Sequence, residues 1–222
     1  MKFSTRGLKV FISVGSPAPT ANPITSITNA KPAVVTPTTI ANFANGDIVK
    51  ITGTSKDSLD NKYFEVANKA GTTFELKCSD ASKETAAATT GNATPYKASE
   101  TGPDLVPFCI DSFSRERPAG EVISVATFCD PQANVAGEGT AGTISWGGPI
   151  DFCNKGFQEM MKAMEDGSER IVVLKFPNDI GSMVVPIEVN AYSESYNLNS
   201  AATFTGGAVA KTAPTLLTCE CP

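Results

Sequence analysis

The residue types that most often carry chemistry are sparse in this chain, which contains no histidine. Histidine is the usual general base and the commonest metal ligand, and most nucleophilic triads run through its imidazole. Ser-His-Asp, Cys-His and histidine-zinc sites are therefore excluded. Chemistry based on lysine, carboxylates or cysteine alone stays open, although no paired motif supports it.

The carboxylates form no evident catalytic pair. Three surround a predicted helix, where a solvent-facing surface explains them: Glu159, Glu165 and Asp166. Three others lie near the ends of predicted strands without a partner evident from the sequence: Asp104, Asp111 and Asp130. We therefore expect no enzyme activity and no cofactor.

The six cysteines are Cys78, Cys109, Cys129, Cys153, Cys219 and Cys221. Their spacing matches neither a CxxC pair nor a zinc knuckle. Buried reduced thiols are the simplest interpretation. Disulfides between neighbouring subunits, formed if the protein meets an oxidising medium, are the alternative, and the terminal segment with Cys219 and Cys221 is the best-placed site for them. Two thiolates fall short of a closed metal site, so we predict none.

Composition favours short strands over long helices. The 222 residues are 41% hydrophobic and only 18% charged, and they are rich in Thr, Ala, Gly and Pro. The net charge of −5 offers no clustered basic surface for a phosphate backbone, so sequence-specific nucleic-acid binding is not expected. The apolar stretch 8–14 is interrupted by Lys9 and is too short for a signal peptide or a membrane span. We expect a soluble protein made in the cytoplasm.

The first half of the chain predicts one strand followed by a separate module. Residues 5–14 alternate as a strand, and the Pro-rich stretch 16–23 reads as a linker. From 24 to 96 the composition changes, and short strand signals alternate with polar turns. Strands are expected at 48–52, 62–67 and 72–77, and the last two form a hairpin. The Ala/Thr-rich run 79–94 is predicted as a loop.

The second half predicts strands around one helix. Strands are expected at 106–114, 121–128, 143–146, 170–176, 183–192 and 201–210. Asn154 is placed to cap the helix and Gly167 to end it. One apolar stripe predicts the packing face of the helix: Phe157, Met160, Met161 and Met164. Pro186 predicts an edge strand or a bulge, and Trp146 is expected in the core.

The phrases "DGSER", "IVVLKFP" and "VPIEVNAYSESYNLNSAATFTGGAVA", which follow the helix in this order, resemble the tail tube proteins of long-tailed bacteriophages. The resemblance covers about residues 105–215 and rests on the order of the predicted elements and on the general character of these sequence segments. It implies a mainly β (α+β) fold, a β-sandwich with one flanking helix. It also implies six-membered rings, stacked head-to-tail into the hollow tube of a virion tail, with DNA passing through the lumen without specific binding. Implied partners are further copies of the chain and the tail terminator, tape measure and distal tail proteins, with assembly in the host cytoplasm and no membrane insertion.

The middle module separately resembles small β-barrel repeats of phage structural proteins, through "FANGDIVKITGT" and "NKYFEVANKAGTTFEL". We therefore expect three parts: 1–23, the first strand and linker of the core; 24–96, an inserted barrel; and 97–222, the rest of the core. The barrel is expected outside the tube.

Two other functions stay open. A β-sandwich carbohydrate-binding or adhesin module would present exposed aromatic side chains in a shallow patch. The inner tube of a contractile injection system would share the tube architecture and differ in having a surrounding sheath.

Overall fold

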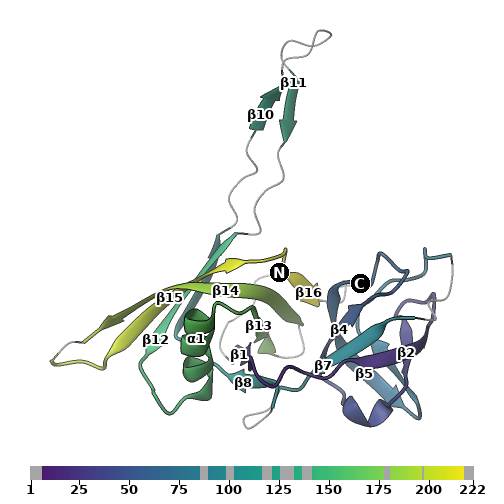
Figure 1. Ribbon diagram of the computed structural model, residues 1–222, viewed down its shortest axis with the longest axis horizontal. Helices are drawn as coiled ribbons and strands as arrows, with labels where there is room; N and C mark the ends of the chain where they lie inside the picture. The colour runs from purple at the N-terminus through teal and green to yellow at the C-terminus, as the bar shows by residue number, and fades with distance from the viewer. Residues whose placement is uncertain are drawn as a thin grey trace.

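The computed structural model consists of a curved sheet, a closed barrel and one α-helix (Figure 1). It describes residues 7–85, 90–98, 103–116, 122–125, 133–136, 142–177, 181–196 and 198–217. The predicted fold class is confirmed, since strands dominate and a barrel accompanies the sheet. The division at residues 23 and 96 stays a prediction.

The eight-stranded sheet has the order β8-β1-β13-β14-β15-β12-β9, and β16 also pairs with β14. Its strands are β1 (Lys9–Ser13), β8 (Leu105–Pro107), β9 (Ser112–Glu116), β12 (Thr143–Pro149), β13 (Arg170–Lys175), β14 (Ser182–Ser195), β15 (Thr203–Ala210) and β16 (Thr215–Leu217). All named pairings within it are antiparallel. A separate two-stranded pair, β10 (Val122–Val125) and β11 (Ala133–Ala136), stands away from the sheet in Figure 1.

The barrel closes in the order β2-β3-β6-β5-β4-β7. Its strands are β2 (Asn22–Ile27), β3 (Val34–Pro37), β4 (Ile48–Thr52), β5 (Lys62–Ala70), β6 (Thr73–Leu76) and β7 (Asn92–Tyr96), with a 3-10 turn at Ile40–Asn42. The predicted β5–β6 hairpin is confirmed. The prediction of a loop over 79–94 is wrong at its end, because β7 begins at Asn92 and closes the barrel between β2 and β4. The two residues that β7 buries are a small one and a proline, Ala93 and Pro95, so the strand lacks the usual hydrophobic pattern.

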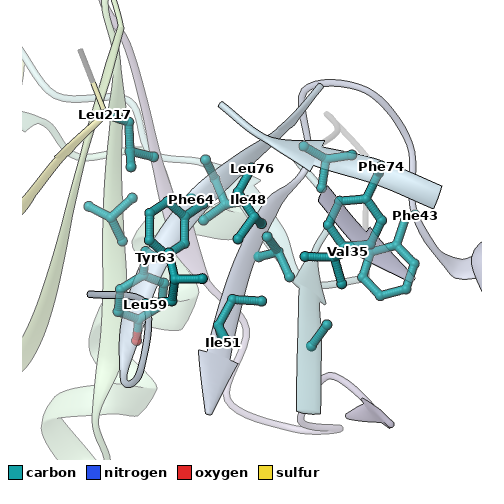
Figure 2. Close-up of a cluster of buried hydrophobic side chains, with 14 of the residues drawn as sticks. Val35, Phe43, Ile48, Ile51, Leu59, Tyr63, Phe64, Phe74, Leu76 and Leu217 are labelled. Carbon is teal, nitrogen blue, oxygen red and sulfur yellow. The ribbon is translucent and has the colours of Figure 1, made fainter. Parts of the chain in front are cut away.

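Side chains from the barrel and from one face of the sheet form a single hydrophobic core (Figure 2). Phe43 stacks on Phe74 inside the barrel, with ring centroids 4.7 Å apart. Phe64 lies beside Leu217 of β16 in the same cluster, which also contains Phe11 of β1. Because apolar burial stabilises by roughly 25 cal/mol per Å2, this shared core fixes the barrel on the sheet.

Polar contacts reinforce this junction. Lys175 Nζ donates to the carbonyl of Gly46 at 2.7 Å, and Ser182 Oγ donates to Glu65 at 3.3 Å. Lys77 pairs with the same Glu65 at 3.2 Å. Burial lowers the pKa of Lys175, as expected for an ammonium withdrawn from water.

The helix α1 (Lys155–Asp166) covers the opposite face of the sheet. Asn154 accepts a hydrogen bond from Phe157 N at 2.9 Å, and Gly167 adopts a left-handed conformation at φ 62°, so both predicted ends are confirmed. Phe157 and Met160 are buried, whereas Met161 is half-buried and Met164 is 37% exposed.

The contact stripe therefore differs from the predicted one. It runs through Gly156, Phe157, Met160 and Ala163, because the first turn of α1 lies directly on the segment after β8.

Two sequence-based strand assignments need correction. The strand expected over 106–114 is interrupted, because residues 108–111 cross from β8, at one edge of the sheet, to β9 at the other. The strand expected to stop at Trp146 continues through Gly147 and Gly148 to Pro149, because these residues still pair with Thr205, Phe204 and Thr203 of β15. Position 148 has little room for a side chain, since a Cβ there would meet the Ile110 Cα at 3.0 Å.

The prediction that Pro186 marks an edge strand is also wrong. β14 is internal, with β13 on one side and both β16 and β15 on the other. The carbonyl of Pro186 accepts from Lys211 N at 2.9 Å. Its missing N–H therefore points to the same side, into the gap between β16 and β15, where no ladder bond is lost. The bulge in β14 lies between Val189 and Ala191.

Candidate assembly surface

The sheet curls so strongly that its two ends face each other. β8 and β12 are separated by four strands in the sheet order, yet Phe108, just after β8, contacts Trp146 of β12 with ring centroids 5.8 Å apart. Phe108 also contacts Phe204 of β15, at 6.2 Å. The inner faces of both halves of this single curled sheet thus enclose one core together with α1.

Trp146 lies at the centre of this inner core and is 2% exposed, as predicted. Its indole N–H donates to Met160 Sδ of α1 at 3.2 Å. Its cross-strand neighbour is Gly206, where any Cβ would lie 2.8 Å from the indole Cε2. A glycine at 206 is therefore required to leave room for the indole ring.

The two outer faces of the curled sheet differ. The barrel covers the outer face of the half formed by β1, β13 and the first part of β14. The outer face of the other half, formed by β9, β12, β15 and the second part of β14, is exposed. Figure 1 shows the barrel on one side of the molecule and the ends of β12 and β15 on the other.

We call this exposed surface the hydroxyl face, after the side chains that dominate it. Strand registers place eight exposed hydroxyl residues on it: Ser112, Ser114, Thr143, Ser145, Ser193, Ser195, Thr203 and Thr205. Ser114 and Ser145 are bonded to each other, with 2.8 Å between their Oγ atoms. The face is therefore polar and composed of short side chains.

Charge on the hydroxyl face is sparse and negative. Its described strand residues include Glu116 and Glu188 but no lysine or arginine. Glu188 pairs at the margin with Lys211, at 2.5 Å, and this hydrogen bond raises the pKa of Lys211. A face whose described strand residues include no lysine or arginine lacks the cationic contacts that dominate binding to a nucleic-acid backbone.

The half-sheet that bears the hydroxyl face has two open edges. β9 pairs with β12 on one side and with no other described strand. On the far side, β13 accompanies β14 only as far as Ile187, so the stretch of β14 beyond it pairs with β15 alone. Open edges expose unpaired backbone N–H and C=O groups, which are templates for pairing with another chain.

The predicted carboxylate positions do not come together as a catalytic pair in the described structure. Glu159 is buried, accepts from Gly15 N at 3.3 Å and pairs with Lys162 at 2.7 Å, so its predicted exposure on a solvated face is wrong. Asp166 bonds Ser168 and pairs with the buried Arg170 at 3.1 Å. Glu165 and Asp111 are exposed.

Asp104 is buried and accepts from Lys97 N at 3.1 Å, a partner that the sequence did not reveal. Asp130 lies outside the described residues.

The described cysteines have different environments. Cys78 is disulfide-bonded, whereas Cys109 and Cys153 are free. The expectation of buried reduced thiols is wrong for all three, because Cys78 is in a disulfide and the other two are exposed. Asn154 Nδ2 lies 3.1 Å from Cys109 Sγ. Cys129, Cys219 and Cys221 lie outside the described residues.

Within the part of the chain that the structure describes, no group of three or more Cys, Asp or Glu side chains could hold a metal ion. No described helix is long and apolar enough to span a membrane.

Comparisons with known proteins gave distant structural matches. No protein-family model matches the sequence, and no curated protein is significantly similar to it. One structural match is a chain from the tail of an empty GTA particle with C6 symmetry, at 14% identity and a TM-score of 0.41, covering 54% of this chain and 90% of the other. A second is a chain from the virion of a native gene transfer agent particle, at 15% identity and a TM-score of 0.39, covering 48% and 83%. Both TM-scores lie below 0.5, so the likeness alone does not establish a shared fold.

Proposed function

We propose that this chain is a non-enzymatic structural subunit of the tail tube of a long-tailed phage. Six copies form a ring, the rings stack head-to-tail, and the hydroxyl face lines the lumen through which DNA passes. Assembly takes place in the host cytoplasm, and the product resides in the virion tail. The resemblance over about residues 105–215 supports this proposal, together with the arrangement of the sheet.

The observation that carries the proposal is the four-stranded half-sheet with two open edges. Its strands alternate in direction in the order β14-β15-β12-β9. Because four is an even number, β9 of one subunit can pair antiparallel with the free part of β14 in the next. Repetition around a ring then yields one continuous barrel without edges. Contacts of this type are heterologous and close after a fixed number of copies.

The two outer faces suit such a ring. The hydroxyl face would form the inner wall, where the absence of lysine and arginine prevents tight binding of phosphate. The barrel, which covers the outer face of the opposite half, would then lie outside the tube and leave the channel open. The β10–β11 pair stands clear of the sheet and would contact a neighbouring ring in such a stack. Further partners of the assembled tube would be tail terminator, tape measure and distal tail proteins.

Cysteine cross-linking tests the edge pairing. Ser114→Cys combined with Ser193→Cys places one thiol near each open edge on the same face. The companion combination, Ser112→Cys with Ser193→Cys, moves the first thiol two residues along β9 and so tests a second pairing register. At least one combination should give covalent oligomers up to a hexamer on mild oxidation of assembled protein. The matched control is Ser145→Cys with Ser193→Cys, in which Ser145 lies on the internal strand β12. Ladders of equal length in the control would contradict pairing through β9.

The carbohydrate-binding alternative gains little from the structure. Trp146, the side chain best suited to stack on a sugar, is buried. The contractile-system alternative shares the same ring geometry and is separated from the present proposal by the presence of a sheath around the isolated tube.

A further inference from the structure

One end of the barrel gathers three loops around a buried lysine. The loops connect β2 to β3, β4 to β5, and β6 to β7. Lys56, in the second loop, is 1% exposed and is the only lysine among the buried polar residues of the described structure. Burying an ammonium group costs free energy unless it is compensated, so a lysine at this position requires an explanation.

Lys56 Nζ contacts the side-chain carbonyl oxygen of Asn29, in the first loop. The amide nitrogen of Asn29 donates to the backbone carbonyl of Glu84, in the third loop, at 2.9 Å. The carboxamide is thus held from both ends, with its oxygen on the lysine and its nitrogen directed away. An amine and a carboxamide fixed in this way satisfy the proximity that a bond-forming step requires.

A carboxylate accompanies the pair. Glu84 Oε1 accepts hydrogen bonds from Ser58 Oγ at 2.7 Å and from Ser58 N at 3.1 Å. These bonds, followed by the positive charge of Lys56, lower the pKa of Glu84 and so favour its ionised carboxylate. The surrounding loops are tied together by a hydrogen bond from Ala81 N to the carbonyl of Ala30 at 3.1 Å.

We propose that Lys56 and Asn29 react to form an intramolecular isopeptide bond that locks this end of the barrel. Lys56 Nζ first loses one proton of its ammonium form to solvent; the resulting amine attacks Asn29 Cγ, a new Nζ–Cγ bond forms, and the Cγ–Nδ2 bond breaks. One proton passes from Nζ, through the Glu84 carboxylate, to the departing nitrogen, which leaves as ammonia. The step exchanges one amide for another and needs no oxidant, reductant or activated co-reactant.

The product has a physical advantage over the unreacted pair. A neutral secondary amide replaces a buried amine and a primary carboxamide, which removes the desolvation cost of an ammonium group. The bond also joins two loops whose reacting residues are 27 positions apart, which restricts the unfolded chain as a disulfide does. A module on the outside of a particle would thereby resist unfolding, although the proposed bond does not depend on tube assembly.

Intact mass spectrometry of the reduced, denatured full-length protein tests the proposal. The expected mass is lower than the sequence mass by one ammonia. Lys56→Met and Asn29→Ala should restore the full sequence mass, and Asn29→Asp should lose one water in place of ammonia. Lys83→Met, which alters an exposed lysine near Glu84, is the matched control and should keep the ammonia loss. A digest should yield one branched peptide that contains both Asn29 and Lys56.

Two results would overturn the proposal. One is an unmodified mass for folded wild-type protein after prolonged incubation at neutral pH. The other is an ammonia loss that persists in Lys56→Met, which would assign it elsewhere, for example to an imide at Asn45-Gly46. Glu84→Gln keeps the backbone carbonyl that orients Asn29 and should slow bond formation in refolded protein at least tenfold. An unchanged rate would remove the carboxylate from the mechanism. Loss of the bond in Lys56→Met should lower Tm by about 5–10 °C.

Discussion

Replacing Gly156 with alanine separates local helix propensity from tertiary packing. Gly156 lies in the first turn of α1, and a Gly→Ala change in a helix ordinarily stabilises by about 0.5–1 kcal/mol. In this structure an added Cβ would meet the backbone at the end of β8, where it would clash with the carbonyl oxygen of Pro107 and with the Cα of Phe108, the latter at 2.7 Å. Backbone atoms cannot rotate away, so α1 must shift.

Overpacking of this kind costs about 1–3 kcal/mol, which exceeds the gain in propensity. We expect a net loss of about 1–2 kcal/mol, or a Tm lower by about 2–8 °C for a chain of this size. Thermal unfolding followed by circular dichroism measures it. The control compares Glu165→Ala with Glu165→Gly at an exposed position of the same helix, where alanine should be the more stable. A Gly156→Ala protein more stable than wild type would refute the packing argument.

Three further predictions concern the described side chains. Hydrogen bonds from Ser168, followed by Arg170, lower the pKa of Asp166 from 3.8 to about 2. The stability that the ionised Asp166 contributes is therefore fully present above the pKa of the unfolded chain, 3.8, and is lost as the pH falls to about 2. Asp166→Asn should therefore unfold with a flatter dependence of Tm on pH between about 4 and 2, and an unchanged slope would contradict this. Maleimide should label Cys109 and Cys153 in the native subunit but Cys78 only after reduction, as peptide mapping would show; native labelling of Cys78 would contradict its disulfide. Met160→Ala should cost about 2–4 kcal/mol and red-shift the fluorescence of Trp146, whereas Met164→Ala, at the exposed end of the stripe, should change both little.

Regular elements were predictable where local signals agree. The cap at Asn154, the stop at Gly167 and the β5–β6 hairpin all depend on residues close in sequence, and all are confirmed. The alternation in β1 correctly separated two sets of side chains. Val10 and Ile12 face the inner core, and Phe11 faces the barrel.

The remaining features depend on contacts between distant segments. Whether β8 and β9 are one strand or two depends on the crossing at 108–111, which follows from the curl of the sheet and not from the residues themselves. The sequence predicts a solvent-facing Glu159, because its contact with Gly15, 144 positions away, cannot be inferred from local residues. The hydroxyl face joins residues from four strands whose registers no local pattern specifies, and the contact of Lys56 with Asn29 joins two loops.

The most direct test of the central claim is negative-stain electron microscopy of the purified protein at high concentration, with and without reductant. The account predicts six-membered rings or hollow tubes of uniform width, with the barrel as an outer projection. Because the proposed edge pairing uses backbone hydrogen bonds, these should persist under reductant. Monodisperse monomers at every concentration and in both redox conditions would contradict it.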